Sequence, residues 1–219
     1  MAEYVKEIII GAIAGLLVIG LEIFLRWLKT KLLNKSIRNF WEFTNKKVVI
    51  VYPVYHQGGQ IINELLAGKE TVISLHLLTT FFKDNKIDYF FQTDSNQIPK
   101  DYDVILLCSP KGNRHSREFV KNIVLPFNIE PINNGSKSFC YYDSESQISY
   151  RSPMDRSIKK NVDIGMITRY IDKQNNRKVF FFWGIHAPGT LGAVKFAVNP
   201  SDLRGISKEV KDRSFRLSS

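Results

Sequence analysis

Two loops in this 219-residue chain combine cations, hydroxyl groups and glycines in a pattern that suits an anionic ligand. The first loop, residues 108–116, reads Cys-Ser-Pro-Lys-Gly-Asn-Arg-His-Ser, and the second, residues 184–190, reads Gly-Ile-His-Ala-Pro-Gly-Thr. Lysine and arginine attract phosphate, glycine lets a backbone approach a ligand closely, and a helix N-terminus offers unpaired N–H groups. The two loops therefore indicate binding of a small anion, a nucleotide in particular.

The predicted ligand-binding residues come from these loops and from an Arg-Ser pair between them. They are Ser109, Lys111, Gly112, Asn113, Arg114, Ser116, Arg151, Ser152, Gly184, His186, Gly189 and Thr190. Neither loop matches the phosphate-binding or dinucleotide-binding glycine patterns, so an ordinary strand-to-helix turn is an alternative for each. No His/Cys cluster with metal-ligand spacing stands out, and the sequence predicts neither a metal nor a resident cofactor.

An alternation of apolar strands and helices is needed to position the loops. Short β-branched or aromatic runs are typical of strands buried on both faces of a parallel sheet. We expect strands at 47–53, 88–93, 103–108, 163–170 and 178–183, a hairpin over 139–151, a helix over 70–84, a helix that Ser116 caps, and a helix after Thr190. The predicted fold is an α/β, Rossmann-like domain with a mostly parallel sheet, whose ligands bind at the carboxyl ends of the strands.

The N-terminal part of the chain predicts a single transmembrane helix. Residues 8–28 are almost uninterruptedly apolar, and as a helix they are about 31 Å long, enough to cross a bilayer core. No basic region precedes them and no small-residue cleavage site follows them, which is unlike a secretory signal. Basic residues crowd the C-terminal flank, which predicts a single-pass protein of the bacterial inner membrane with its larger part in the cytoplasm.

One face of this helix carries Gly11, Gly15, Val18 and Glu22. Glycines four residues apart allow close helix approach, and an ionisable group at this depth is a candidate for function. We therefore expect a homo-oligomer whose helices meet on this face and form a pore. An alternative is that Glu22 lies near the interface and pairs with Arg26 four residues on.

Three segments follow from these patterns: the transmembrane helix at 1–28, an amphipathic connector at 29–46, and the ligand-binding domain at 47–219. The formal net charge is +10, and much of the excess lies beside the predicted span and in the tail. Membrane lipid is therefore an expected partner. No basic helix with interleaved aromatic residues occurs, so we expect no sequence-specific nucleic-acid binding. Two cysteines argue against a disulfide scaffold.

The order of three motifs within residues 103–198 resembles an uncharacterised domain found C-terminal to helix-turn-helix regions in bacterial regulators. The motifs read Cys-Ser-Pro-Lys-Gly-Asn, Tyr-Arg-Ser-Pro-Met-Asp and Gly-Ile-His-Ala-Pro-Gly-Thr-Leu-Gly-Ala-Val. That domain carries Gly where this chain has Ser109. The resemblance implies a portable ligand sensor, because one module joined to different outputs most simply reports a ligand.

The overall layout is similar to that of CRISPR-associated membrane effectors with a CARF domain, and of other nucleotide-gated membrane proteins of antiviral defence. This similarity implies that a bound cyclic nucleotide regulates membrane permeability. An alternative is an enzyme, because Ser109, Ser116 and Glu118 resemble the strand-loop-helix of TIR domains, whose glutamate cleaves NAD. Glu118 or His186 is then the catalytic residue, although a first-turn acid such as Glu118 also stabilises a helix by itself. A structural anchor or docking protein is a third possibility.

Overall fold

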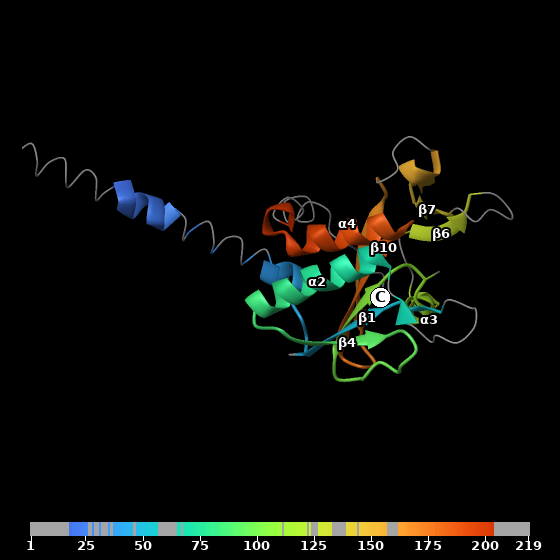
Figure 1. The fold of residues 1–219 in the computed structure, drawn as a ribbon, viewed down its shortest axis with the longest axis horizontal. Helices are drawn as coiled ribbons and strands as arrows, with labels where there is room; N and C mark the ends of the chain where they lie inside the picture. The colour runs from blue at the N-terminus through green and yellow to red at the C-terminus, as the bar shows by residue number, and fades with distance from the viewer. Residues whose placement is uncertain are drawn as a thin grey trace, which may run out of the picture. The chain divides into compact units, whose positions relative to one another are not determined.

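The computed structural model describes residues 18–25, 28, 31, 35, 37–45, 47–56, 65, 66, 68–110, 112–121, 123, 127–132, 139–143, 145–156 and 162–203. The chain divides into two compact units, Phe43–Val198 on the one hand and Met1–Glu42 with Asn199–Ser219 on the other. The larger unit holds all the strands of the described residues (Figure 1).

A five-stranded sheet forms the centre of the larger unit. Its strands, in spatial order, are β4 (Asp88–Thr93), β1 (Lys47–Tyr52), β5 (Asp103–Leu107), β10 (Arg177–Gly184) and β9 (Gly165–Asp172). The first four are parallel, and β9 pairs with β10 in the antiparallel direction. The predicted α/β class with a mostly parallel sheet is confirmed.

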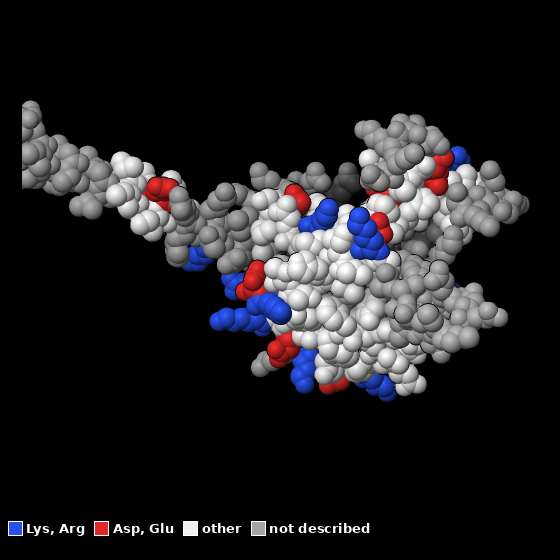
Figure 2. Space-filling view, in the orientation of Figure 1, with Lys and Arg blue, Asp and Glu red and all other residues white. Residues whose placement is uncertain are grey.

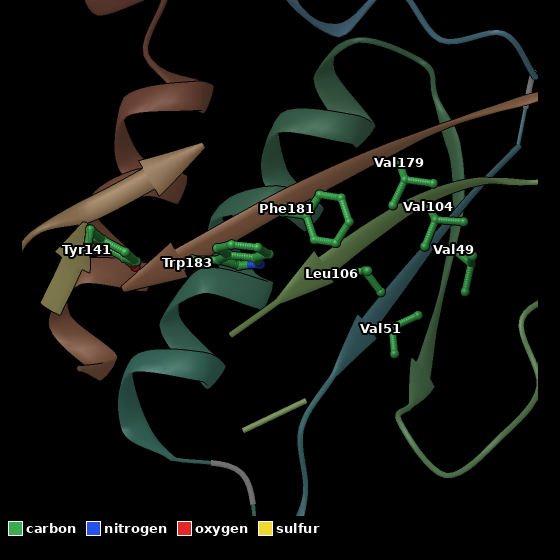
Figure 3. Close-up of a cluster of buried hydrophobic side chains, with 8 residues drawn as sticks. All are labelled: Val49, Val51, Val104, Leu106, Tyr141, Val179, Phe181 and Trp183. Atoms are coloured by element: carbon green, nitrogen blue, oxygen red, sulfur yellow. The ribbon is translucent and has the colours of Figure 1, made fainter. Parts of the chain in front are cut away.

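The three central strands β1, β5 and β10 are buried on both faces, which explains their uninterrupted apolar sequences. On one face, β1, β5 and β10 contribute Val49, Val51, Val104, Leu106, Val179, Phe181 and Trp183 to a cluster that Tyr141 joins (Figure 3). On the other face, the Phe180 ring contacts Phe43, which in turn contacts Phe82. Phe82 belongs to α2 (Lys69–Asp84), which lies against α4 (Ala187–Val198).

A smaller antiparallel sheet supplies Tyr141. It consists of β6 (Phe127–Pro131), β7 (Phe139–Asp143) and β8 (Ile148–Arg151), in that spatial order. The predicted hairpin over 139–151 is confirmed, and Asp143 closes its turn by accepting hydrogen bonds from the backbone N–H groups of Glu145 and Ser146. The remaining elements are α3 (Arg114–Val120), a 3-10 turn η1 (Pro153–Arg156) and the short antiparallel pair β2 (Tyr55–His56) and β3 (Leu65–Leu66).

Only part of the predicted span is among the described residues, and Gly11 and Gly15 lie outside them. Residues 18–25 are helical, and their apolar side chains are exposed: Val18 is 66% and Ile23 64% accessible. Glu22 is exposed as well. Within the described part of the chain, no helix is both long and apolar enough to cross a bilayer.

The turn from β9 to β10 is held by a buried ion pair. Arg177 Nε donates to Asp172 Oδ2 over 2.8 Å, and both residues are less than a tenth exposed. The Arg177 guanidinium also donates to the Pro99 carbonyl and lies 5.4 Å from the centre of the Phe119 ring. Burial alone raises the pKa of Asp172, but hydrogen bonds from Asn175 and Arg177 outweigh it, so the pKa lies below its ordinary value.

Replacing Asp172 by asparagine is expected to lower the free energy of unfolding at pH 7 by about 1 to 3 kcal/mol, because the buried Arg177 charge loses its ionised acceptor. The native pKa is depressed, so the stabilisation is complete above the unfolded pKa of about 3.9 and is lost as the pH falls through the native value. Urea unfolding at pH 7, 5, 4 and 3 measures this. The gap between wild type and variant is expected to close toward pH 3.

The exposed residue Asp101 supplies a matched control. Asp101→Asn is expected to change the free energy of unfolding by less than about 0.5 kcal/mol at any pH. An undiminished gap for Asp172→Asn at pH 3 contradicts the role of the ionised carboxylate.

Candidate functional site

The carboxyl ends of β5 and β10 bring the sequence motifs together. These strands are parallel neighbours, so the loop after Leu107 and the loop after Gly184 leave the sheet at the same edge. The Cys108 backbone N–H donates to the Phe182 carbonyl over 3.0 Å, which joins the end of β5 to β10. Cys108 has a positive φ of 81°, and the chain turns away from the sheet there.

The Arg-Ser-Pro-Met-Asp and Gly-Ile-His motifs meet through a pair of side chains. His186 Nε2 lies 3.0 Å from Asp155 Oδ1, and the two side chains are 35% and 14% exposed. Ser152 is fully buried, its hydroxyl accepts the Met154 N–H, and its carbonyl accepts the Asp155 N–H. Ser152 therefore shapes the turn that presents Asp155. Arg151 is exposed at the end of β8.

Asp163 occupies the N-terminus of α4. One of its oxygens, Oδ2, accepts hydrogen bonds from the backbone N–H groups of His186 (2.7 Å) and Gly189 (2.9 Å). A carboxylate at this position complements the positive end of the helix dipole. The N–H groups that we expected to be available to an anionic ligand are thus bound by an anion of the chain itself.

Close backbone packing explains two of the predicted glycines. A Cβ atom at Gly184 meets the His186 carbonyl oxygen and the Thr190 nitrogen, and one at Gly189 meets the Ile164 carbonyl oxygen and the Asp163 carboxylate. Both glycines are buried. They let β10, the segment before β9 and the first turn of α4 approach one another closely.

Several residues around this edge hold buried polar atoms without a hydrogen-bond partner. Five such side-chain atoms occur among the described residues: Tyr141 Oη, Asp155 Oδ2, Asp163 Oδ1, Trp183 Nε1 and Thr190 Oγ1. We call these five residues the carboxyl-edge cluster. The pKa of Tyr141 is raised by burial and, to a smaller extent, by the nearby Asp163 and Cys108 charges, so its hydroxyl keeps its proton and can donate. Trp183 and Tyr141 lie in the same core cluster (Figure 3).

The first loop is organised by Asn113, which is fully buried. Its Nδ2 donates to the Leu107 carbonyl (2.9 Å) and the Val51 carbonyl (3.4 Å), and its Oδ1 accepts the Ser116 N–H (3.2 Å). Asn113 is thus the N-cap of α3, and the prediction that Ser116 caps this helix is wrong. The Ser116 hydroxyl donates instead to the Cys108 carbonyl, because the helix starts earlier than the apolar pattern indicates.

The Asn113 side chain lies at the point where a ligand of such a sheet usually binds. Along the chain, β4 follows β1 and pairs on one side of it, and the next strand of the sheet, β5, pairs on the other side. The strand order therefore reverses between β1 and β5, and this position is the topological switch point. The Asn113 amide bridges the carboxyl ends of these two strands. The carboxyl-edge cluster lies one strand further along, at the ends of β5 and β10.

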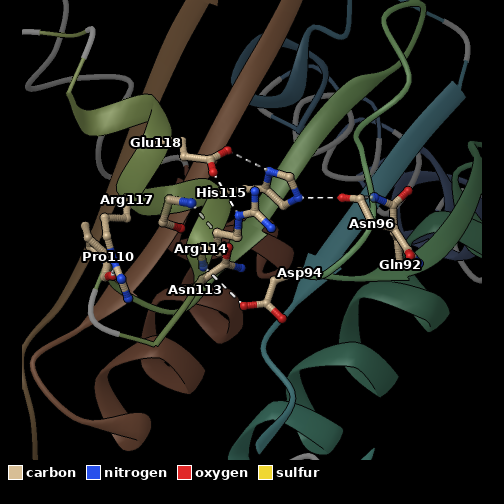
Figure 4. A network of polar contacts seen from close by, with 10 residues as sticks. Gln92, Asp94, Asn96, Pro110, Asn113, Arg114, His115, Arg117 and Glu118 are labelled. Carbon is tan, nitrogen blue, oxygen red and sulfur yellow. Dashed lines mark hydrogen bonds and ion pairs between the residues drawn. The ribbon is translucent and has the colours of Figure 1, made fainter.

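The rest of the first loop forms a surface network (Figure 4). Arg114 Nε lies 2.9 Å from Glu118 Oε1, with both side chains at least half exposed. The hydrogen bond from Arg114 lowers the pKa of Glu118, so this carboxyl is an ionised, paired surface group. His115 Nε2 donates to the Asn96 carbonyl over 2.6 Å. This environment gives Glu118 no feature of a catalytic acid, whose pKa is typically raised in a cleft.

Three further predicted residues belong to this loop: Ser109, Lys111 and Gly112. Ser109 and Gly112 are partly buried, and the Ser109 carbonyl accepts the N–H groups of Gly112 and Asn113. Lys111 lies outside the described residues. On the face drawn in Figure 2, the Lys and Arg side chains of the described residues are interspersed with Asp and Glu side chains.

No protein-family model, curated protein or solved structure matches this chain. Within the described residues, no group of three or more His, Cys, Asp or Glu side chains is arranged to hold a metal ion.

A shallow depression of about 410 Å³ lies away from the carboxyl edge, between the end of α2 and the amino end of β4. Lys83, Lys86 and Tyr89 are among the residues that line it. The geometry of the carboxyl edge therefore carries the functional argument.

The ligand-binding residues predicted from the sequence include His186, Thr190 and the glycines at this edge, but not Asp155, Asp163 or Tyr141. The acid that closes the Arg-Ser-Pro-Met-Asp motif and the aspartate ahead of β9 were visible in the sequence. Their partners are 31 and 23 residues away, respectively, so only the fold reveals the pairing.

Proposed function

We propose that this protein is a membrane-held sensor of the bacterial inner membrane. Its α/β unit binds a nucleotide-type signal at the carboxyl-edge cluster, and binding regulates how the N-terminal helices of several copies associate. The output is a change in membrane permeability, as in defence against phage. The observation that carries the proposal is the concentration of unpartnered buried polar atoms at one edge of the sheet.

Such atoms are costly, which is why their grouping supports a binding site. Each buried polar group without a partner destabilises a protein by about 1 to 3 kcal/mol. Groups of this kind are rare in native structures, and a catalytic role or a bound water or ion are among their explanations. The cluster also lies on the carboxyl side of the parallel strands, which is the side of such sheets where ligands bind, one strand away from the switch point.

The helical residues 18–25 support the membrane part of the proposal. Val18, Leu21 and Ile23 are more than half exposed, as are other apolar side chains on different faces of the same segment. A helix that is apolar all round is stable in a protein core or in lipid, and not in water. Lipid and the helices of further copies are the surroundings that suit these residues.

Alkaline carbonate extraction of bacterial membranes tests the membrane part. The full-length chain is expected to stay in the membrane pellet, and a variant without residues 1–28 is expected to move to the supernatant. Complete extraction of the full-length chain overturns this part of the proposal.

Thermal unfolding of the detergent-solubilised full-length chain tests the binding part. At about 100 times its Kd, a nucleotide is expected to raise Tm by about 5 to 10 °C. His186→Ala and Thr190→Val are expected to reduce this shift, whereas Lys173→Ala, at an exposed turn, retains it. If no mono-, di- or cyclic nucleotide shifts Tm at millimolar concentration, the binding proposal is wrong.

A second candidate function rests on the His186–Asp155 pair. A carboxylate that orients an imidazole is the usual arrangement of a general base, and His186 is partly exposed. The activity is then hydrolysis of a bound nucleotide, NAD included. Incubation of the full-length chain with NAD or nucleotides, followed by chromatography, distinguishes the two. Product formation that His186→Ala abolishes favours the enzyme, and binding without turnover favours the sensor.

A further inference from the structure

We infer that the carboxyl-edge cluster recognises the vicinal hydroxyl groups of a ribose, and not a phosphate group. The inference rests on the proposed nucleotide-binding function and specifies which part of the ligand this site holds. The two oxygens that lack partners on Asp155 and Asp163, together with the donors on Trp183 and Tyr141, carry the argument.

The donor and acceptor inventory of the cluster selects the chemistry. Asp155 Oδ2 and Asp163 Oδ1 are carboxylate oxygens that only accept, whereas Trp183 Nε1 only donates. The Tyr141 hydroxyl keeps its proton, and Thr190 Oγ1 can donate or accept. A hydroxyl group both donates and accepts, so adjacent hydroxyls can give partners to the carboxylates and to the indole at once. Phosphate oxygens only accept, and an ammonium group only donates.

The electrostatics also exclude phosphate from this position. The N–H groups of His186 and Gly189, which point out of the start of α4, already bind Asp163 Oδ2. A phosphate here has to face the negative charges of both Asp163 and Asp155. The phosphates of a bound nucleotide therefore lie elsewhere, and exposed Arg151, next to the turn that holds Asp155, is the cation that suits them.

Each of the two carboxylates is held in place through one of its oxygens, and its other oxygen is left for the ligand. Asp155 Oδ1 is fixed by His186 Nε2, and Asp163 Oδ2 is fixed by the two backbone N–H groups of α4. Each residue thus presents one oriented oxygen, which is what recognition of a diol requires. The His186 side chain is 35% exposed and that of Asp155 14%, so the ligand approaches from the side of this pair.

Titration of the full-length chain in detergent tests the inference. The probes are the adenosine and guanosine 5′-monophosphates, their 2′-deoxy counterparts and inorganic phosphate. The ribonucleotide that binds is expected to bind about 10- to 100-fold more tightly than its deoxy counterpart, because the missing hydroxyl leaves buried polar groups unpaired. Inorganic phosphate is expected to cause no Tm shift.

Two conservative variants test the contributions of individual groups in the cluster. Trp183→Phe removes the indole donor, and Asp155→Asn removes the carboxylate charge. Each is expected to reduce ribose-over-deoxyribose discrimination to less than threefold, and Asp155→Asn provides the result if Trp183→Phe does not fold. Equal binding of ribo- and deoxynucleotides to the wild type overturns this inference and leaves the proposed function standing. Binding of neither, at millimolar concentration, overturns both.

Discussion

Gly184→Ala is expected to lower the free energy of unfolding by about 3 kcal/mol, because the added Cβ meets backbone atoms that cannot move independently. These atoms are the His186 carbonyl oxygen, the Thr190 nitrogen and, at 2.7 Å, the Gly189 carbonyl carbon. Relief of this overlap requires α4 to shift away from β10. The variant is therefore also expected to lose the ligand-dependent rise in Tm, and urea unfolding and thermal shift measure the two effects.

Gly192 provides the matched control, because it lies in the same helix and a Cβ there meets nothing within 4 Å. Gly192→Ala is expected to raise the free energy of unfolding by about 0.5 to 1 kcal/mol, since alanine favours a helix interior over glycine. Equal effects of the two substitutions would falsify the close packing at Gly184.

Asn113→Ala is expected to be about as damaging, with a loss of about 3 kcal/mol in the free energy of unfolding. The substitution removes the N-cap of α3 and leaves the Leu107 and Val51 carbonyls without the amide that bridges them. Urea unfolding monitored by circular dichroism measures the loss.

Asn113→Asp separates the two roles of the side chain. Aspartate is as good an N-cap as asparagine, but its second oxygen places a negative charge against the two strand carbonyls. The Asp variant is therefore expected to lose at least as much stability at pH 7 as the Ala variant. Arg114→Ala, in the neighbouring exposed ion pair, is expected to cost less than about 1 kcal/mol. Wild-type stability of Asn113→Asp contradicts the bridging role.

The fold could be predicted from the sequence to a large extent because burial leaves a local signal. Strands β1, β4, β5 and β10 are contiguous apolar or aromatic runs, and the turn around Asp143 has the polar composition of a hairpin turn. The antiparallel direction of β9 left no such signal, because a short run does not record the direction of its neighbours. The start of α3 was also missed, because Asn113 caps it within a loop rather than at the edge of an apolar pattern.

The candidate site was only partly predictable, for a different reason. The composition of the loops predicted His186 and Thr190 as ligand-binding residues, and both lie near the carboxyl end of β10. It did not reveal that Asp163 occupies the start of α4 or that Asp155 orients His186, because these contacts depend on how β9 and η1 are placed in space. The backbone N–H groups of His186 and Gly189 at the start of α4, which we expected to be available to an anionic ligand, bind Asp163 instead. The residue types indicate which chemistry is possible, but the hydrogen bonds that each group already makes determine which of its atoms can still bind a ligand.

The position of α4 has a mechanical consequence. The first turn of α4 directly follows His186 and contains Thr190, so it lies at the candidate site. The last residue of α4, Val198, is also the last residue of the larger unit. Twelve helical residues form a stiff rod of about 18 Å. The helix therefore joins the residues around the candidate site to the last residue of the larger unit through a single stiff element.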